Sequence, residues 1–203
     1  MNLISMEHLD TVYENDVFSL VPITTEALAE QYLEVRIEDA FLPSLYEDET
    51  ARQTEMEEVL EDRTFYCGII SKGAGVFTGY CGINNIFAET PELAIAILKK
   101  YQHKGYGFEA LNAFMKTVKE MTGIAHFIAK VDPENAASRQ LMIKLGFKPA
   151  GIATFLIDDE DKLIRLEEEN MEYLTKDLVE LAGEFNVEPR KLLSHLLVYA
   201  IDL

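Results

Sequence analysis

Residues 93–107 read Leu93-Ala94-Ile95-Ala96-Ile97-Leu98-Lys99-Lys100-Tyr101-Gln102-His103-Lys104-Gly105-Tyr106-Gly107. The apolar run 93–98 predicts a buried strand, and the segment after Gly105 predicts a helix. The turn between them is basic and places two glycines at the helix start. The first N–H groups of a helix lack partners within it and lie at the positive end of its dipole, so they favour a phosphate. We therefore expect a site for a phosphorylated cofactor at this turn.

The charge pattern points to the same turn. The chain has 36 acidic and 18 basic residues, for a net charge of −18. Residues 99–149 reverse this balance with 9 Lys or Arg against 4 Asp or Glu, whereas 1–98 hold 4 against 19 and 150–203 hold 5 against 13. Lysines also decorate solvated helix faces, but several here cluster at the turn itself. The acidic remainder disfavours nucleic acid and anionic membranes as partners and suits a cationic substrate.

Composition sets the remaining bounds. With 203 residues and 48% hydrophobic content, the chain is long enough to bury a core. Cys67 and Cys81 lack metal-ligand spacing and fall in expected strands, so we predict free, buried thiols in a reducing compartment. Residues 1–14 lack the pattern of a signal peptide, and no segment reaches the roughly 20 apolar residues needed to span a bilayer. A cytoplasmic protein that binds no metal is expected.

The hydrophobic periodicity predicts alternating strands and helices. Before the glycine turn we expect a strand at 17–22, a helix capped by Thr25, a break at Pro43, an acidic helix at 50–62, and strands at 65–71, 78–86 and 92–98. After it we expect a helix to about 121, a strand at 125–131, a helix from Asn135 to Gly146, and strands at 152–157 and 163–171. Turn residues at 72–75 and 158–161 predict two hairpins.

Residues 176–203 carry two apolar stripes at helical spacing. The first comprises Leu178, Leu181, Ala182 and Phe185, and the second follows Pro189 and comprises Leu192, Leu193, Leu196, Leu197, Ala200 and Ile201. We predict two helices here. A helix that is apolar nearly all round must be covered, either by docking onto the core or by a second subunit in a homodimer, and both alternatives stay open.

A dinucleotide fold is an alternative interpretation of the glycine turn, because Gly105 to Ala110 also fits G-x-G-x-x-A, with Asp132 downstream as a candidate ribose ligand. Three features disfavour it. Six polar residues separate Leu98 from Gly105, the motif follows a hairpin instead of opening a βαβ unit, and Asp132 stands directly before Pro133. No Gly-Lys-Ser/Thr follows, which excludes a Walker loop.

Two motifs together resemble the GNAT acetyltransferase superfamily. The first is Gln102-His103-Lys104-Gly105-Tyr106-Gly107, which matches the Gln/Arg-x-x-Gly-x-Gly/Ala loop of that family. The second is Asn135-Ala136-Ala137-Ser138 with Leu141 and Lys144-Leu145-Gly146-Phe147. The order of elements is similar over residues 17 to about 175, most of all to the branch that acetylates ribosomal-protein N-termini and, close to it, polyamines.

The resemblance implies a mixed α/β (α+β) fold, with a central, mostly antiparallel, splayed sheet flanked by helices. Residues 1–175 would form the acetyl-CoA-binding domain, and 176–203 a C-terminal helical extension. Acetyl-CoA would be the acetyl donor, with no metal required. Its pyrophosphate would contact the N–H groups of the loop formed by Gln102, His103, Lys104, Gly105, Tyr106, Gly107 and Phe108. Backbone groups of Ile97 and Leu98 would bond the pantetheine arm, and Asn135 would contact the arm or the thioester end.

The resemblance also suggests catalytic residues. Relatives often place the carboxylate that takes the amine proton where this chain has Glu92, although a solvated strand-end Glu would look the same. Many relatives have a tyrosine acid where this chain has Met142. Ser138 is the remaining hydroxyl on that helix, one turn after Asn135, and it would equally serve for capping or packing.

The expected function is transfer of an acetyl group to a primary amine by direct attack in a ternary complex. Acidic residues at 47–49, 89, 92, 158–161 and 167–169 border the acceptor side in relatives, formed by loops 41–50, 84–91 and 155–162. They favour a cationic acceptor, such as a protein N-terminus or a polyamine, although acidity also maintains solubility. The missing tyrosine leaves a non-catalytic acetyl-CoA sensor as the competing function.

Overall fold

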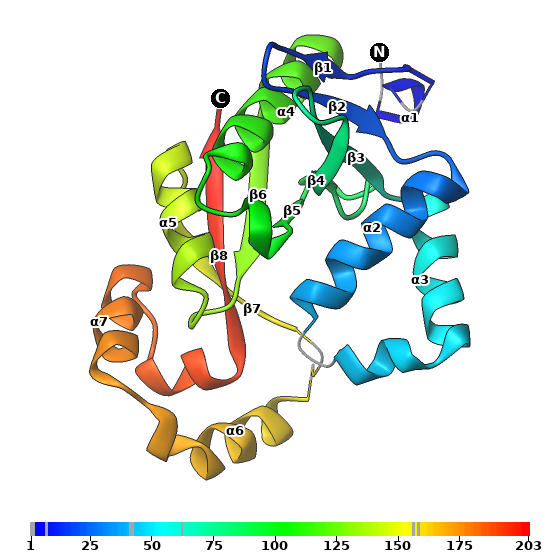
Figure 1. The fold of residues 1–203 in the computed structure, drawn as a ribbon. Helices are drawn as coiled ribbons and strands as arrows, with labels where there is room; N and C mark the ends of the chain where they lie inside the picture. The colour runs from blue at the N-terminus through cyan, green and yellow to red at the C-terminus, as the bar shows by residue number, and fades with distance from the viewer. Residues whose placement is uncertain (1–2, 7, 41–42, 62, 156, 158) are drawn as a thin grey trace. The chain divides into compact units, whose positions relative to one another are not determined.

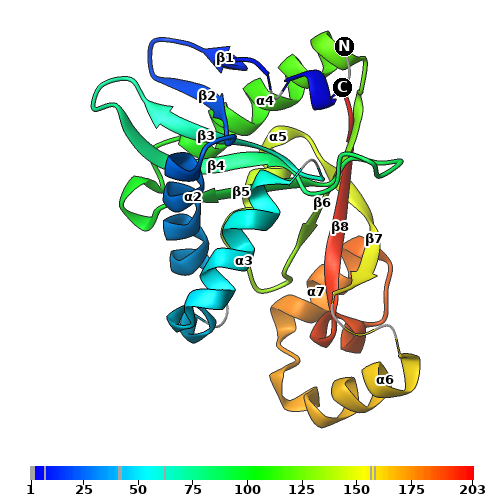
Figure 2. The same ribbon diagram turned by 90° about the vertical axis from the view of Figure 1, so that its right-hand side faces the viewer.

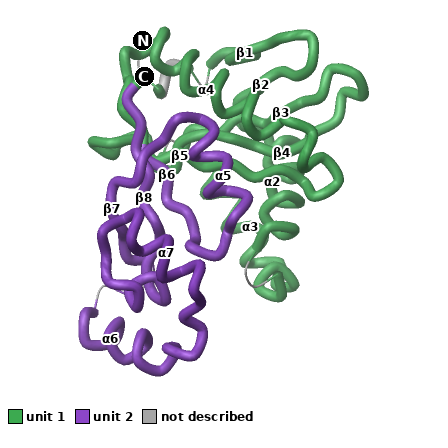
Figure 3. Tube along the Cα trace, turned by 90° about the vertical axis from the view of Figure 1, so that its left-hand side faces the viewer, with its two compact units in different colours: residues 1–127, 203 green, residues 128–202 purple. Residues whose placement is uncertain are grey.

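The computed structural model describes all of residues 1–203 except 1–2, 7, 41–42, 62, 156 and 158. The chain divides into two compact units (Figure 3), residues 1–127 with Leu203 and residues 128–202. The mixed α/β fold with antiparallel strands and flanking helices is confirmed.

The first unit is built on a five-stranded sheet with the strand order β1-β2-β3-β4-β5 (Figure 1). The pairings are antiparallel throughout. The strands are β1 (Tyr13–Glu14), β2 (Phe18–Pro22), β3 (Phe65–Ser71), β4 (Val76–Ile83) and β5 (Leu93–Ile97), and a short helix α1 (Leu3–Met6) precedes them. The expected hairpin of β3 and β4 is present, and β5 forms an edge of this sheet.

Helices cover both faces of this sheet (Figure 2). One face carries α2 (Glu26–Asp39) and α3 (Glu49–Leu60), which are joined through η1 (Pro43–Glu47). Thr25 caps α2 as expected, because its hydroxyl accepts from the Leu28 N–H. The other face carries α4 (Tyr106–Thr122), where Phe114 packs against Phe65 with ring centroids 5.8 Å apart.

The second unit contains a three-stranded sheet in the order β6-β8-β7. Its elements are β6 (His126–Val131, which starts in the first unit), α5 (Ala136–Leu145), β7 (Lys148–Thr154), α6 (Glu160–Glu169), η3 (Met171–Tyr173), α7 (Lys176–Phe185), η4 (Pro189–Leu193) and β8 (His195–Asp202). The predicted strand 125–131 and the predicted helix ending at Gly146 are both confirmed.

The second predicted hairpin is wrong. Segment 160–169 is the helix α6, with Leu163 and Glu167 buried one turn apart. Asp159 caps it by accepting from the Lys162 N–H, a local bond that favours a helix start over a hairpin turn. Asp158, the first residue of the predicted turn, lies outside the described residues.

The helix predicted after Pro189 is also wrong. Residues 195–202 form the strand β8, which lies between β6 and β7 and pairs antiparallel with β7. The run 196–201 is almost continuously apolar, and periodicity alone does not separate a buried strand from a buried helix in such a run. The second stripe is therefore packed within its own unit, with Leu192, Leu197 and Tyr199 buried. Of the predicted helical extension, only α7 is an α-helix.

Candidate active site

The glycine turn connects the edge strand β5 to α4. After β5 the chain forms η2 (Lys99–Tyr101), and the Lys99 N–H donates to the carboxylate of Glu38 at the end of α2. His103 and Gly105 have φ angles of 59° and 88°, in the left-handed region where glycine is unstrained. This backbone path directs the first N–H groups of the 17-residue helix α4 toward the turn, as an anion site requires.

Side chains brace the turn and surround it with positive charge. Gln102 Nε2 donates to the Ile97 carbonyl at 2.9 Å, and Lys104 Nζ donates to the Lys100 carbonyl at 2.8 Å. The ammonium groups of both lysines lie 5.2 Å from the centroid of the Tyr101 ring. The two cations are therefore held close to the turn, where they raise its attraction for anions.

The backbone groups of Ile97 and Leu98, at the end of β5, are directed differently. The Asn84 N–H donates to the Glu92 carbonyl and the Leu98 N–H donates to the Thr78 carbonyl. Because bonded and non-bonded pairs alternate in an antiparallel ladder, the backbone groups of Ile97 are directed to the outer edge of β5, where its carbonyl accepts from Gln102 Nε2. Those of Leu98 are engaged, since its carbonyl also accepts from the Tyr101 N–H. A ligand lying along this edge would therefore meet Ile97 before Leu98.

Glu92 immediately precedes β5, on the sheet face that α2 and α3 cover. Its Oε1 accepts from Asn84 Nδ2 at 2.7 Å, and Asn84 Oδ1 accepts from the Tyr66 hydroxyl at 2.7 Å. Glu92 is half-buried. A carboxylate with one oxygen held in this way has a defined orientation, as a group that receives a proton needs.

Asn135 and Ser138 lie together on the first turn of α5, in the second unit. Asn135 is the N-cap, and its Oδ1 accepts from the Ser138 N–H at 3.0 Å. Ser138 is half-buried, and Met142, one turn further on, is 2% exposed. The structure thus gives Asn135 a capping role, and it buries an apolar side chain where relatives have a tyrosine.

A polar and aromatic network lies on the face of the sheet that α2 covers, and it was not predicted from the sequence. The rings of Tyr32, Tyr66 and Tyr80 contact one another with centroids 4.7–5.7 Å apart. Glu55 accepts from the hydroxyls of Tyr32 and Tyr46 and from Arg36. Tyr66 and Tyr80 could have been expected to share a face of the sheet from their places in the strands. Their proximity to Glu55 on α3 depends on tertiary packing, which the sequence does not show.

Burial and charge shift the acidities of these groups. Desolvation and the neighbouring Tyr80 raise the pKa of Tyr66, and burial raises the pKa of Tyr80 to about 12. Burial opposes ionisation of Glu55, yet the hydrogen bond and charge of Arg36 with the two tyrosine hydroxyls hold its pKa below the ordinary value. The network therefore stays as neutral phenols around one ion pair near neutral pH.

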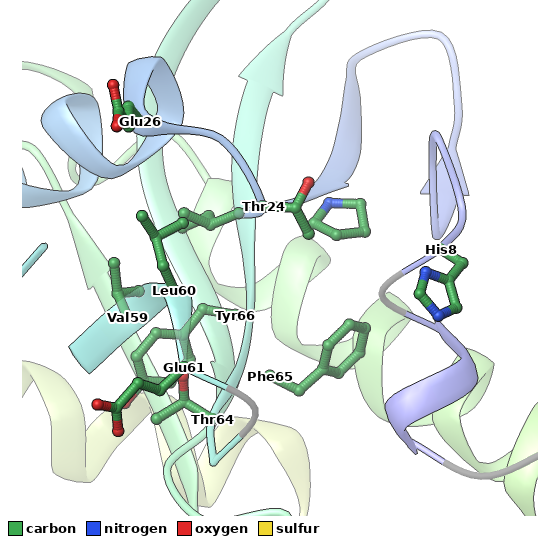
Figure 4. Close-up of a pocket in the computed structure, with 11 residues that line it drawn as sticks. His8, Thr24, Glu26, Val59, Leu60, Glu61, Thr64, Phe65 and Tyr66 are labelled. Carbon is green, nitrogen blue, oxygen red and sulfur yellow. The ribbon is translucent and has the colours of Figure 1, made fainter. Parts of the chain in front are cut away.

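A hollow of about 420 Å³ lies beside this network (Figure 4). Its walls are His8, Pro22, Ile23, Thr24, Glu26, Val59, Leu60, Glu61, Thr64, Phe65 and Tyr66. Figure 4 shows Glu61 and Thr64 beside Tyr66, with Glu26 on α2 and His8 on the N-terminal segment. Tyr66 thus belongs both to this hollow and to the hydrogen-bonded chain that leads to Glu92.

The family model of the GNAT acetyltransferase domain matches residues 18–148, more than half of the chain. The chain belongs to the GNAT acetyltransferase family. It is therefore an acetyl-CoA-dependent N-acetyltransferase.

Solved structures share the fold of this acetyltransferase. A ribosomal-protein-S5-alanine acetyltransferase from Vibrio fischeri is 13% identical with a TM-score of 0.62, covering 94% of this chain and 95% of its own. A GNAT-family acetyltransferase from Bacillus anthracis is 19% identical with a TM-score of 0.60, covering 93% and 96%. RimL, a ribosomal L7/L12 α-N-protein acetyltransferase in complex with coenzyme A, is 14% identical with a TM-score of 0.64, covering 95% and 98%. No curated protein matches the sequence.

Two further properties concern the described part of this acetyltransferase. Within it, no group of three or more His, Cys, Asp and Glu side chains is arranged to hold a metal ion. None of the helices described there is long and apolar enough to span a membrane. Cys67 and Cys81 are free thiols, buried opposite each other on β3 and β4, and burial raises the pKa of both.

Proposed function

We propose that this acetyltransferase acetylates a primary amine that carries further positive charge, with Glu92 as the base. The observation that carries this proposal is the anchored Glu92 carboxylate at one end of β5, while the other end of the same strand leads into the cofactor turn. One edge strand thus links the base to the donor site, as direct transfer in a ternary complex requires.

On the donor side, the pyrophosphate of acetyl-CoA would bind the N–H groups of residues 103–108. The left-handed conformations of His103 and Gly105 and the two adjacent lysines support this assignment. The pantetheine arm would bond the outward N–H of Ile97, whose carbonyl accepts from Gln102 Nε2. The N–H and carbonyl of Leu98 are both engaged within the protein, so Leu98 would lie beside the arm, next to Ile97, without a backbone hydrogen bond to it.

In the reaction, Glu92 takes a proton from the acceptor ammonium, directly or through a water molecule. The freed amine attacks the thioester carbonyl, a C–N bond forms, and the C–S bond breaks to release the CoA thiolate. The nitrogen loses its second proton as the amide forms, and this proton replaces the one that the thiolate takes up. The thiolate then needs a proton. Ser138 is the proposed hydroxyl, because Met142 has no proton to give.

Three of the acidic residues expected on the acceptor side have structural roles. Asp48 and Asp159 are helix caps, and Glu167 is buried with its carboxylate bonded to Ser194. Glu26 and Glu61 of the hollow are exposed. These two, with Glu92, are the carboxylates that we propose attract a cationic acceptor such as a protein N-terminus or a polyamine.

A second function is a sensor that binds acetyl-CoA without turnover, and the buried Met142 in place of a tyrosine acid favours it. Turnover with a panel of amines, followed as free thiol release, separates the two. The enzyme releases CoA faster with cationic amines than with neutral amines of equal size, whereas a sensor releases none.

Two further proposals concern context. A homodimer remains a proposal, now restricted to α7, where Val179 is 46% exposed. Light scattering of the full chain tests it, and a monomeric mass refutes it. Cytoplasmic location is likewise proposed, supported by the two free thiols.

A further inference from the structure

Three side chains form a continuous hydrogen-bonded chain in the first unit: Tyr66 on β3, Asn84 directly after β4 and Glu92 directly before β5. The Tyr66 hydroxyl on β3 bonds Asn84 Oδ1 at 2.7 Å, and Asn84 Nδ2 bonds Glu92 Oε1 at 2.7 Å. Asn84 and Glu92 are also a backbone-bonded pair, with the Asn84 N–H donating to the Glu92 carbonyl at 2.9 Å. Their side chains therefore leave neighbouring strands on the same face of the sheet.

The orientation of the Asn84 amide follows from its two neighbours. An ionised carboxylate only accepts hydrogen bonds, so Asn84 must present its NH₂ group to Glu92. Its carbonyl oxygen is then directed to Tyr66, which must donate its hydroxyl proton. Rotating the amide by 180° would set its oxygen against the carboxylate, so Glu92 selects the amide orientation and the Tyr66 hydroxyl holds it by donating to the carbonyl oxygen.

Packing fixes the Tyr66 hydroxyl. The Tyr66 ring stacks on Tyr32 at 5.7 Å and contacts Tyr80 at 5.4 Å. It also lies across Gly82, where an added Cβ would come within 2.5 Å of Tyr66 Cδ1. The glycine opens the path by which the ring crosses β4 toward Asn84.

We infer that Asn84 and Tyr66 are positioning residues for the proposed base: Tyr66 holds the Asn84 amide in place, and Asn84 holds the Glu92 carboxylate toward the acceptor amine. This inference rests on the proposed function. Neither residue itself gains or loses a proton. They act on the geometry of proton transfer. Misplacing a catalytic group by about 1 Å can lower the rate by about a hundredfold.

Steady-state kinetics on the full chain test the inference with Tyr66→Phe and Asn84→Asp, each alone and combined with Glu92→Gln. Tyr66→Phe keeps the ring and its packing and removes only the hydroxyl. Asn84→Asp keeps the side-chain shape, removes the N–H donor and sets a second carboxylate against Glu92, so Tyr66→Phe, which adds no charge, is the cleaner of the two variants. Tyr13→Phe is the matched control: it removes the hydroxyl of a ring on β1 that packs on Phe18 of β2, and it keeps wild-type kcat.

We expect Glu92→Gln to lower kcat about a hundredfold, the size of a general-base contribution. Tyr66→Phe should lower kcat about tenfold and Asn84→Asp somewhat more, as misplacement of the base predicts. KM for acetyl-CoA should stay within about twofold, because that turn is untouched. The distinguishing result is non-additivity: in the Glu92→Gln background, neither change lowers kcat further.

The outcomes separate the inference from the proposed function. If Glu92→Gln is impaired but Tyr66→Phe is not, or if Tyr66→Phe costs equally in both backgrounds, the positioning role is refuted and the base assignment stands. A fully active Glu92→Gln variant refutes both. Thermal unfolding and acetyl-CoA calorimetry on each variant identify any misfolded one, and Tyr66→Phe supplies the answer where Asn84→Asp fails to fold.

Discussion

Gly107→Asp tests the cofactor turn with a single charge. Gly107 is the second residue of α4, so an aspartate there lies beside the first N–H groups, where the pyrophosphate is proposed to bind. An acidic side chain at a helix start stabilises the helix by about 0.3–1 kcal/mol. The variant should therefore remain folded while it repels the ligand.

The size of the effect follows from Coulomb's law. Two unit charges about 5 Å apart repel by roughly 1 kcal/mol in bulk water and roughly 3 kcal/mol at an effective dielectric constant of about 20. Since about 1.4 kcal/mol is tenfold in affinity, CoA should bind roughly tenfold to a hundredfold more weakly. Screening over about 10 Å at 0.1 M salt should reduce the difference as salt is raised.

Calorimetry with CoA measures this loss, and thermal unfolding verifies the fold. Lys116→Ala is the matched control, because it also lowers the charge of α4 by one unit but at an exposed position further along the helix. It should bind CoA within about twofold of wild type, since exposed charges more than a Debye length away are largely screened. A folded Gly107→Asp variant with wild-type affinity would refute the assignment of the pyrophosphate to this turn.

Three other perturbations have defined outcomes. Truncation after Thr175 removes β8, the middle strand of the sheet in the second unit. Because each buried large apolar side chain contributes roughly 1.5–3 kcal/mol, the truncated protein should lose solubility. A truncated protein that is equally soluble, and equally stable by thermal unfolding, would contradict this packing. Ser138→Ala leaves the backbone N–H that Asn135 caps, so it should lower kcat without lowering the unfolding temperature; unchanged kcat excludes the hydroxyl as the proton donor. Arg36 and two tyrosine hydroxyls lower the pKa of Glu55. The stability that they contribute is therefore present above the ordinary pKa of 4.5 and is lost as the pH falls below that value. Glu55→Gln should flatten the pH dependence of the unfolding midpoint in this window, and an unaltered dependence refutes the role of the Arg36–Glu55 pair.

Features set by local sequence could be predicted. The glycine that begins α4, the Asn135 cap of α5 and the β3–β4 hairpin each depend on residues within a few positions of one another. Their backbone conformations follow from glycine at positive φ, side-chain capping and turn composition. For the same reason the sequence could place the glycine turn, the proposed cofactor site, at the start of a helix.

Features set by contacts distant in sequence could not be predicted. The apolar run 196–201 suits a helix or a strand, and only its place between β6 and β7 selects the strand. The Tyr66–Asn84–Glu92 chain depends on the register of three strands. The resemblance to the family suggested Glu92 as a base, but the sequence contained no sign of the two residues that hold it.

Acetyl-CoA turnover against matched cationic and neutral primary amines, followed as thiol release at low and high salt, tests the central claim most directly. Thiol release should depend on the amine and be faster for cationic acceptors, and this preference should disappear as salt is raised. In Glu92→Gln, release should fall about a hundredfold. Tight acetyl-CoA binding with no thiol release for any amine, or full activity in Glu92→Gln, would contradict it.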